Sequence, residues 1–399
     1  MGVTANKPGV CTTVQDGGRR GYMGSGFSPS GVMDQRAYHI ANILLDNPAD
    51  APVLEFCLAG PTLRFTTSTV IAITGGDFRP MLDGRPIASY TAVPVEHGSV
   101  LSFSAPRTGV YGYLAVAGGS FRVEKVMGSY STNLKCGIGG YKGRKLQTGD
   151  YVPFVTKAVD YLPHLGSRTL PRSEAFPCED SDEITLRAIP GPQDDLFTDE
   201  GIRTFFDAPY TVTSKCDRMG FRLEGPIVTT KQGSDIISDG IALGAVQIPD
   251  HGQPIIMLAD RQTTGGYAKI ATVASVDIPL LVQSKPGRVI HFERITVEEA
   301  QKLYRDGHRQ MMAWMQRVNR PSYGDVSPRK TARRLTPILE EQARMSKKSN
   351  EQNWTQTNRY LHADRRAAIA DRLRKEAELA RTIINAAEGG DGPSPGPRS

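Results

Sequence analysis

The sequence predicts a mostly β fold in two strand-rich lobes, with a few short helices and a basic C-terminal tail. The 399 residues include 41 glycines and 27 prolines, and only 7% are aromatic, a composition typical of short strands joined by many turns. Short apolar runs separated by turn clusters extend to about Asp150 and again from Ile184 to about Arg305. A chain of this length can form two or three domains, each with its own core.

The first lobe is expected over residues 1–156. One helix is predicted at 34–45, because its apolar residues follow helical spacing, Asp34 can cap its N-terminus and Pro48 lies just beyond its end. The runs expected to form strands are 53–58, 61–65, 69–76, 99–103 and 111–119.

The second lobe is expected over residues 184–317. Short helices are predicted near 198–206 and at 296–305, where a capping box begins the helix at Thr296 and Gly307 ends it. The runs expected to form strands are 184–189, 234–243, 255–259, 270–275 and 288–293.

Residues 157–183 lack periodicity and contain prolines and charges, so they are interpreted as a linker between the lobes. A short similarity between 56–65 and 221–230 suggests a duplicated architecture.

The tail over 318–399 contains 16 basic and 10 acidic residues, which accounts for the whole net charge of +6. A helix is plausible around 358–388, and the rest of the tail is expected to be disordered. Because the folded body is neutral, we expect no nucleic acid bound to it.

Several classes of site and location are disfavoured by the sequence. The five cysteines form no C-x-x-C pattern and are interpreted as reduced, buried thiols of a cytoplasmic protein. No apolar run approaches the ~18 residues of a membrane span. The seven histidines show no ligand spacing, so no metal is expected, and phosphate-loop, zinc-protease and nucleophile-elbow motifs are absent.

Clusters of polar residues in glycine-rich turns remain as candidate sites. They lie at 14–34, 191–197, 217–249 and 259–270. Glycines allow a ligand to approach the backbone closely, and arginine matches a carboxylate with two hydrogen bonds, although such residues also form ordinary turns. The cluster at 259–270 is the strongest, because it follows a buried strand and its polar groups need partners or a ligand.

Nine ordered segments together resemble one family, the allophanate hydrolase subunit 2 family, also described as biotin-dependent carboxyltransferase or as the 5-oxoprolinase C subunit, which includes a kinase-inhibitor antagonist. These segments are TTVQDGGRRGY (12–22), SPSGVMD (28–34), GPTLRF (60–65), YLAVAGG (113–119), GSYST (128–132), GRKLQTGD (143–150), GPQDDLF (191–197), DRMGFRLEGP (217–226) and ADRQTTGGYAKI (259–270). The resemblance implies two cyclophilin-like β-barrel subdomains.

The resemblance also implies partners and cofactors. A subunit 1 homologue is expected to complete the protein, with a lactam-utilisation protein or a biotin carboxylase as a possible further component. ATP is then used by the complex and bound mainly by partner subunits, whereas biotin is the cofactor under the alternative interpretation.

Under a carboxyltransferase hypothesis, the site passes a carboxyl group from carboxybiotin to an amide or urea nitrogen. Arg261, with the N–H groups of Gly265 and Gly266, would hold the developing anion, and Lys269 or Tyr267 would stabilise charge. The residues expected to orient the ureido group or the acceptor amide are Gln262, Thr263 and Thr264.

Under a 5-oxoprolinase hypothesis, the same cluster binds 5-oxoproline, a lactam that carries a carboxylate. Arg261 or Arg218 would take the carboxylate and Gln262 the lactam, while ATP drives ring opening. Under a third hypothesis, the chain only binds a subunit 1 homologue as a non-catalytic antagonist.

The remaining candidates belong to these same clusters. Asp260 joins the catalytic set, and Asp16 or Asp34 is a possible proton relay. The further substrate-binding candidates are Gln15, Ser30, Asp217 and Asp239.

Overall fold

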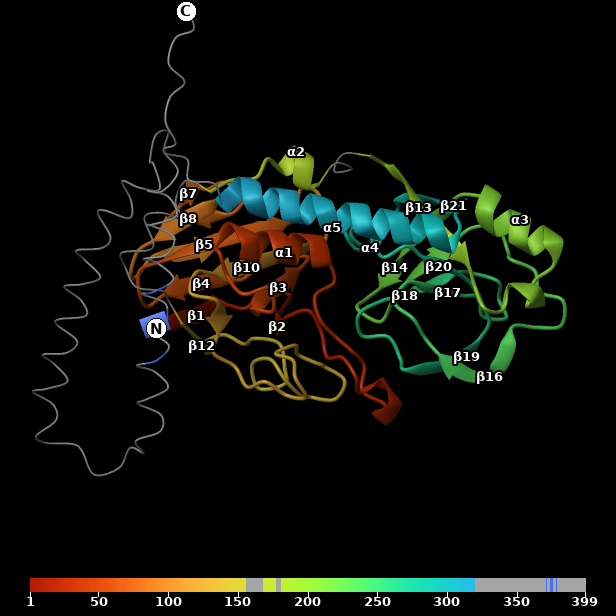
Figure 1. The fold of residues 1–399 in the computed structure, drawn as a ribbon, viewed down its shortest axis with the longest axis horizontal. Coiled ribbons are helices and arrows are strands. Elements are labelled where there is room, and N and C mark those ends of the chain that lie inside the picture. Colours follow the sequence, from red (N-terminus) through yellow and green to blue (C-terminus); the bar gives the residue numbers. More distant parts are fainter. Residues whose placement is uncertain (156–167, 177–180, 320–370, 372–373, 376–377, 379–399) are drawn as a thin grey trace, which may run out of the picture. The chain divides into compact units, whose positions relative to one another are not determined.

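A computed structural model describes residues 1–155, 168–176 and 181–319, together with positions 371, 374, 375 and 378. Residues 1–320 form one compact unit, shown in Figure 1. Most of the predicted linker at 157–183, and the predicted helix at 358–388 apart from the four isolated positions, lie outside the described residues.

The N-terminal lobe consists of two sheets that face each other across an apolar core. The first, in spatial order, is β11 (Ser120–Phe121), β12 (Tyr151–Val155), β1 (Gly2–Lys7), β4 (Thr62–Phe65), β9 (Val100–Ser102), β6 (Met81–Leu82) and β7 (Arg85–Pro86). The second is β2 (Cys11–Gln15), β3 (Val53–Cys57), β10 (Tyr111–Val116), β5 (Thr69–Gly75) and β8 (Ala92–Val95).

The C-terminal lobe is a closed barrel of seven strands. Their order around the barrel is β13 (Glu183–Pro190), β20 (Lys269–Val273), β17 (Ala245–Gln247), β18 (Ile255–Met257), β15 (Gly220–Glu224), β14 (Tyr210–Cys216) and β21 (Val289–Arg294). The first and last strands in sequence, β13 and β21, run parallel and close the barrel. A separate antiparallel pair, β16 (Asp235–Gly240) and β19 (Thr264–Tyr267), forms a two-stranded sheet, called the β16–β19 sheet below.

The helices are few and mostly short. They are η1 (Met23–Ser25), α1 (Gln35–Leu44), α2 (Arg172–Ala175), η3 (Asp194–Leu196), α3 (Asp199–Asp207), α4 (Ile278–Val282) and α5 (Val297–Asn319). The predicted mostly β class is therefore confirmed, and each of the ten predicted strands overlaps an observed one.

The first predicted helix is confirmed as α1, with Asp34 as its N-cap accepting a hydrogen bond from the Ala37 N–H at 2.9 Å. The capping box of α5 is also confirmed, because the Glu299 carboxylate accepts from the Thr296 N–H at 2.8 Å.

The predicted end of α5 at Gly307 is wrong, since the helix continues to Asn319. A Cβ at Gly307 would lie 3.3 Å from Val276. Close packing therefore favours a glycine inside the helix, and the burial of Trp314 and Val318 stabilises the later turns.

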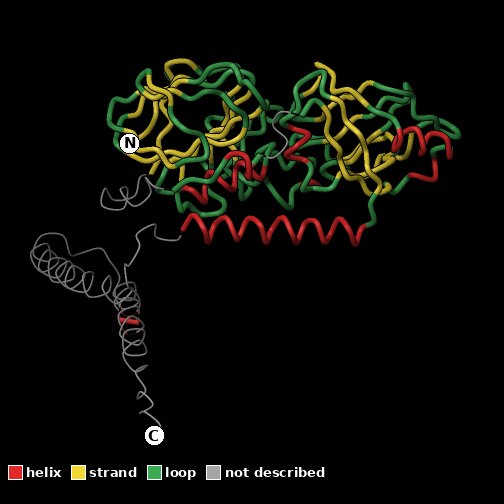
Figure 2. Tube along the Cα trace, turned by 90° about the horizontal axis from the view of Figure 1, so that it is seen from above, coloured by secondary structure: helices red, strands yellow, loops and turns green. Residues whose placement is uncertain are grey.

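The two lobes are held together by apolar and polar contacts. One continuous apolar cluster includes Ile40 of α1, Ile248 of the barrel lobe and Trp314 of α5. Figure 2 shows α5 running alongside both lobes, and it packs against α1 and β13. Polar contacts cross the same interface, including an Nε2–Oδ2 hydrogen bond of 2.9 Å from Gln283 to Asp34.

The described cysteines are less buried than the sequence predicts. Four thiols are free, but Cys136 is exposed and Cys11, Cys57 and Cys216 are only half-buried, so the prediction of buried thiols is wrong for these four. They lie in turns or at strand ends, where burial is incomplete. Cys178 lies outside the described residues.

Candidate functional site

A cavity of about 980 Å³ lies between the two lobes and is called the inter-lobe pocket below. The glycine-rich segment after β2, helices α1, α4 and α5, and the turn after β18 supply its walls. Its polar and charged lining residues are Arg19, Arg20, Ser30, Gln35, Arg36, His39, Ser173, Glu174, Arg261, Ser275, Tyr304, His308, Gln310 and Trp314.

The lining of the inter-lobe pocket carries more positive than negative charge. It contains four arginines but one acid, Glu174, and that carboxylate forms an ion pair of 2.9 Å with Arg317. Apolar side chains such as Met33, Leu258 and Ile278 complete the wall. A basic cavity with apolar walls suits a small organic anion.

Arg261, the first catalytic candidate, is only 7% exposed and lines this pocket. Its guanidinium donates to two backbone carbonyls, from Nε to Ile241 at 2.9 Å and from Nη1 to Leu258 at 3.1 Å. Among the described residues no carboxylate forms an ion pair with it. Burial lowers the pKa of the guanidinium, so an anion in the pocket would supply the missing counter-charge.

A second buried arginine, Arg19, lies in the same wall at 1% exposure. It donates to the carbonyls of Val126 and Ser131, at 3.2 and 3.0 Å, while its Nη1 has no hydrogen-bond partner in the part of the chain that the structure describes. Burial lowers its pKa as well. The two guanidiniums come from segments far apart in the sequence, and the fold brings them to one cavity.

Asp16 positions the loop that carries Arg19. Its carboxylate accepts from the hydroxyls of Ser129 and Ser131, at 2.6 and 2.5 Å, and from the N–H groups of Gly18 and Tyr130. These four hydrogen bonds occupy a carboxylate that does not line the pocket.

Two further buried polar atoms at the pocket, the Ser30 hydroxyl and the Trp314 indole nitrogen, have no hydrogen-bond partner among the described residues. Ser30 also has a φ of 54°, in the left-handed region that a non-glycine residue seldom adopts. A buried donor without a partner costs stability, and a ligand offering an acceptor would remove that cost.

Arg218 and Asp260 form a network beside the pocket rather than in its wall. The Arg218 guanidinium holds Asp260 at 2.8 and 3.1 Å, forms an ion pair with Glu55 and donates to the Gly31 carbonyl at 2.6 Å. Each of its three nitrogens donates to a protein acceptor, so the geometry assigns this pair to holding the lobes together.

The other candidates near the lobe interface also have local partners. Gln15 is buried and donates to Thr13 and to the Thr132 carbonyl. Asp34 accepts from Ala37 and Gln283, and Asp217 caps the turn at Met219 and Gly220. None of these three lines the inter-lobe pocket.

Residues 262–270 of the cluster do not line the inter-lobe pocket. Thr264, Gly265, Gly266 and Tyr267 form β19, and Gln262 and Thr263 lead into it. Lys269 follows in β20, 3.7 Å from the Asp239 carboxylate of β16. The structure therefore separates Arg261 from the residues predicted to act with it.

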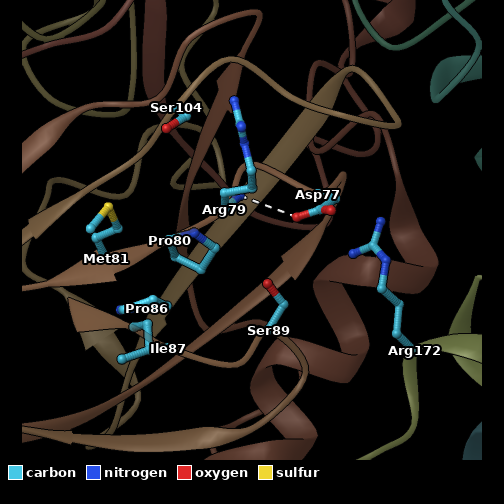
Figure 3. Close-up of a pocket in the computed structure, with 9 residues that line it drawn as sticks. All are labelled: Asp77, Arg79, Pro80, Met81, Pro86, Ile87, Ser89, Ser104 and Arg172. Atoms are coloured by element: carbon cyan, nitrogen blue, oxygen red, sulfur yellow. Dashed lines mark hydrogen bonds between the residues drawn. The ribbon is translucent and has the colours of Figure 1, made fainter. Parts of the chain in front are cut away.

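A smaller cavity of about 500 Å³ lies in the N-terminal lobe (Figure 3). Asp77 accepts there from the Arg79 backbone N–H at 3.2 Å and pairs with Arg107 at 3.0 Å. Arg172 donates to the Gly75 carbonyl at 2.8 Å. With these groups engaged, the cavity is a weaker candidate than the inter-lobe pocket.

The part of the chain that the structure describes holds no group of three or more His, Cys, Asp or Glu side chains placed to bind a metal ion. Within the same residues, no helix combines the length and the apolarity needed to cross a membrane.

Several pocket residues are missing from the candidates predicted from sequence. Arg19 belongs to a predicted cluster without being singled out in it, and Trp314 and His308 lie beyond the predicted end of α5. The signal for Arg19 is the paired arginines of the GGRRG segment. For Trp314 the signal is a continued helical spacing of apolar residues after Gly307.

Comparisons with known proteins place these observations in context. A family model described as the carboxyltransferase domain, subdomain A and B, matches residues 25–294. The 5-oxoprolinase C subunit of Escherichia coli (strain K12) is 38% identical over 310 residues, covering 77% of this chain and 96% of that protein. The urea amidolyase of Saccharomyces cerevisiae is 33% identical over 74% of this chain, but the match covers 17% of that protein.

Solved structures show the same relationship. The Kluyveromyces lactis urea carboxylase superposes with a TM-score of 0.72 at 31% sequence identity, over 78% of this chain and 29% of that one. The Kluyveromyces lactis urea amidolyase superposes with a TM-score of 0.71 at 30% identity, over 20% of its own length. This chain thus spans less than a third of either structure.

Proposed function

Because the chain belongs to the carboxyltransferase domain, subdomain A and B, family, we propose that it is a subunit of a 5-oxoprolinase-type enzyme, an ATP-dependent amidohydrolase acting on a lactam. The observation that carries the proposal is the buried Arg261 guanidinium, which lines the inter-lobe pocket and has no carboxylate partner within the described residues. Similarity to a 5-oxoprolinase C subunit along 96% of that protein's length supports this choice.

The substrate class follows from the pocket's chemistry. A lactam acid carries one carboxylate on a small, partly apolar ring. The carboxylate would sit against Arg261 and within the field of Arg19, and the ring against Met33 and Ile278. Charge-assisted hydrogen bonds to a guanidinium are among the strongest in proteins. The contact with Arg261 would therefore largely determine how the substrate is oriented in the pocket.

The carbonyls of Ile241 and Leu258 fix the Arg261 guanidinium before any ligand arrives. A donor held in place needs no reorganisation when charge develops on the substrate. His39 adds a polar group whose pKa is lowered, first by burial and then by the charge of His308. A neutral imidazole at the pocket can accept or donate a hydrogen bond at neutral pH.

Other subunits would complete the enzyme. ATP, when bound to the complex, supplies the free energy for opening the lactam. We place ATP mainly on partner subunits, a subunit 1 homologue and a lactam-utilisation protein, because this sequence lacks a glycine-rich phosphate loop. This chain would bind the carboxylate of the substrate.

A biotin-dependent carboxyltransferase is the second candidate function, favoured by the family model and by the similarity to urea carboxylase. Under this alternative, Arg261 would stabilise negative charge developing on a ureido oxygen. The apolar walls and the basic lining of the inter-lobe pocket fit a ring that carries such a charge.

The experiment is co-expression with a subunit 1 homologue and a lactam-utilisation protein, followed by an assay of ATP hydrolysis driven by 5-oxoproline. Arg261→Ala should lower kcat/KM on the order of 10²-fold, because it removes charge-assisted hydrogen bonds in a site sheltered from water. Arg107→Ala is the matched control, since that arginine is exposed and outside the pocket; its activity should be unchanged.

A parallel assay with urea and carboxylated biotin tests the carboxyltransferase. Turnover in that assay, with none on 5-oxoproline, would replace the first function by the second. A complex that forms normally but turns over neither substrate would favour the non-catalytic antagonist.

A further inference from the structure

A second cluster of buried polar groups lies on the barrel, away from the inter-lobe pocket. Gln247 of β17 and Lys269 of β20 are neighbours in register on paired strands and are 3% and 2% exposed. Among the described residues, neither the buried Gln247 Nε2 nor the buried Lys269 Nζ has a hydrogen-bond partner, although Lys269 has an ion-pair partner, Asp239, at 3.7 Å. An acceptor bound between the two nitrogens would give each of them a hydrogen bond.

The β16–β19 sheet lies against this cluster, through Gly265 at Gln247 and through Asp239 at Lys269. A Cβ at Gly265 would lie 2.9 Å from the Gln247 Nε2 and 2.7 Å from the Ile241 side chain, so the backbone of β19 packs directly on these two side chains. Figure 1 shows β16 and β19 side by side at one edge of the barrel lobe. Five of the six residues of β16 are exposed, so solvent reaches the outer side of this sheet.

An acidic residue, Asp239, lies beside the Lys269 ammonium. The Asp239 carboxylate lies 3.7 Å from the Lys269 Nζ and accepts a 3.5 Å hydrogen bond from Gln193. Its pKa is lowered, first by the Gly240 N–H and then by the charge of Lys269, so it is ionised at neutral pH. Because Asp239 balances the ammonium and would repel an anion, the cluster suits a neutral ligand.

We propose that this cluster binds a neutral cis-amide, the group shared by lactams and cyclic ureas. The ligand carbonyl accepts from the Lys269 Nζ and the Gln247 Nε2, and the ligand N–H donates to Asp239. The choice of an amide rests on the proposed function for its substrate class, but the site is built from residues that do not line the inter-lobe pocket.

The test is binding of two small neutral probes to the full chain, followed by saturation-transfer NMR. 2-Pyrrolidinone represents a lactam and 2-imidazolidinone a cyclic urea, and the tighter binder identifies the source. Gln247→Leu should weaken binding roughly ten-fold or more, since it removes one of the two donors to the carbonyl. Leucine replaces an unpartnered buried amide at similar volume, so this variant should fold.

Two further variants test whether the probes bind at this cluster. Asp239→Asn exchanges an exposed acceptor without a core change and should also weaken binding. Arg107→Ala, at an exposed arginine outside both sites, should leave both probes bound as in the wild type. Absence of wild-type binding, or binding unaffected by Gln247→Leu and Asp239→Asn, would overturn the proposal, as would loss of binding in Arg107→Ala alone.

Failure here and failure of the proposed function are distinguishable. If the complex is inactive on 5-oxoproline but this chain still binds the probes through Gln247, only the enzyme activity is refuted. If the complex is active but this chain binds neither probe, only this site is refuted.

Discussion

The Arg218 guanidinium of the barrel lobe forms an ion pair with the buried carboxylate of Glu55 in β3, across the interface between the lobes. Glu55 also accepts from the Met33 N–H at 2.7 Å, in the segment that leads into α1. The ion pair therefore links the barrel, a central strand of the N-terminal lobe and the wall of the inter-lobe pocket.

Removing one member of this pair should be costly. Arg218→Met leaves Glu55 and Asp260 without their counter-charge, and we expect a loss of about 3–5 kcal/mol in the free energy of unfolding. The measurement is urea unfolding followed by circular dichroism. Lys125→Ala is the control, because Lys125 and Asp50 form an exposed pair and its removal should change stability by less than about 1 kcal/mol. Equal effects of the two substitutions would contradict the buried role.

Alanine substitutions at Gly31 and Gly21 distinguish the cost of backbone strain from the cost of steric crowding. Both have positive φ, 93° and 89°, but a Cβ at Gly31 would lie 2.9 Å from Gly18 whereas nothing lies within 4 Å at Gly21. Each change to alanine carries the left-handed cost of about 1–2 kcal/mol, and Gly31→Ala adds overpacking of about 1–3 kcal/mol. Thermal unfolding should show the lower Tm for Gly31→Ala, and equal Tm values would exclude the crowding.

The stability contribution of Asp34 should depend on pH. Burial raises the pKa of Asp34 above its ordinary value, despite hydrogen bonds from Ala37 and Gln283. The folded state thus favours the protonated acid. The contribution of Asp34 to stability is greatest below the unfolded pKa of about 3.9 and falls as pH rises through the folded pKa.

Asp34→Asn removes that titration and keeps an N-cap oxygen. The stability of the variant relative to wild type should therefore improve as pH rises above about 4, by roughly 1.4 kcal/mol for each unit by which the pKa is raised. Urea unfolding at several values between about pH 4 and pH 7.5 measures the difference. A difference that stays constant over this range would show that Asp34 does not titrate with folding.

Cys11 should be the more reactive thiol of a cross-strand pair. Cys11 and Cys57 are partners in register on β2 and β3, and the hydrogen bond from Cys57 lowers the pKa of Cys11 to about 7, while the pKa of Cys57 is raised. Alkylation of Cys11 by iodoacetamide, followed by mass spectrometry, should have a midpoint near that pH.

Cys57→Ala should return Cys11 toward the ordinary pKa of about 8.5 and slow its alkylation at pH 7 roughly ten-fold. Cys136 in the same samples is an internal reference, because it is exposed and its environment does not include Cys57. A Cys11 rate that does not change in the variant would contradict the hydrogen bond.

Local signals in the sequence predict ten of the strands and the starts of two helices. Asp34 caps α1 and Thr296 begins α5, and both signals depend only on residues a few positions away in the sequence. Very short strands such as β6 and β17 are not predicted, since two or three residues carry too little alternation to be recognised. The longer strands β1, β2, β12, β14 and β15 are also absent from the prediction.

The candidate site was less predictable, because it depends on pairing between distant segments. Residues 259–270 form one polar cluster in sequence, yet the fold places Arg261 at the inter-lobe pocket and Lys269 beside Asp239 of β16. The buried position of Arg19 likewise depends on carbonyls at 126 and 131. No local pattern encodes either arrangement.

The parallel pairing of β13 with β21 has a consequence for synthesis. β13 is the first strand of the barrel to leave the ribosome, and the strand that closes the barrel against it is the last. Until Arg294 has emerged, one edge of β13 has no partner and can pair with another nascent chain. Translation speed over the second lobe therefore sets how long that edge stays open, and slow codons there would favour misassembly.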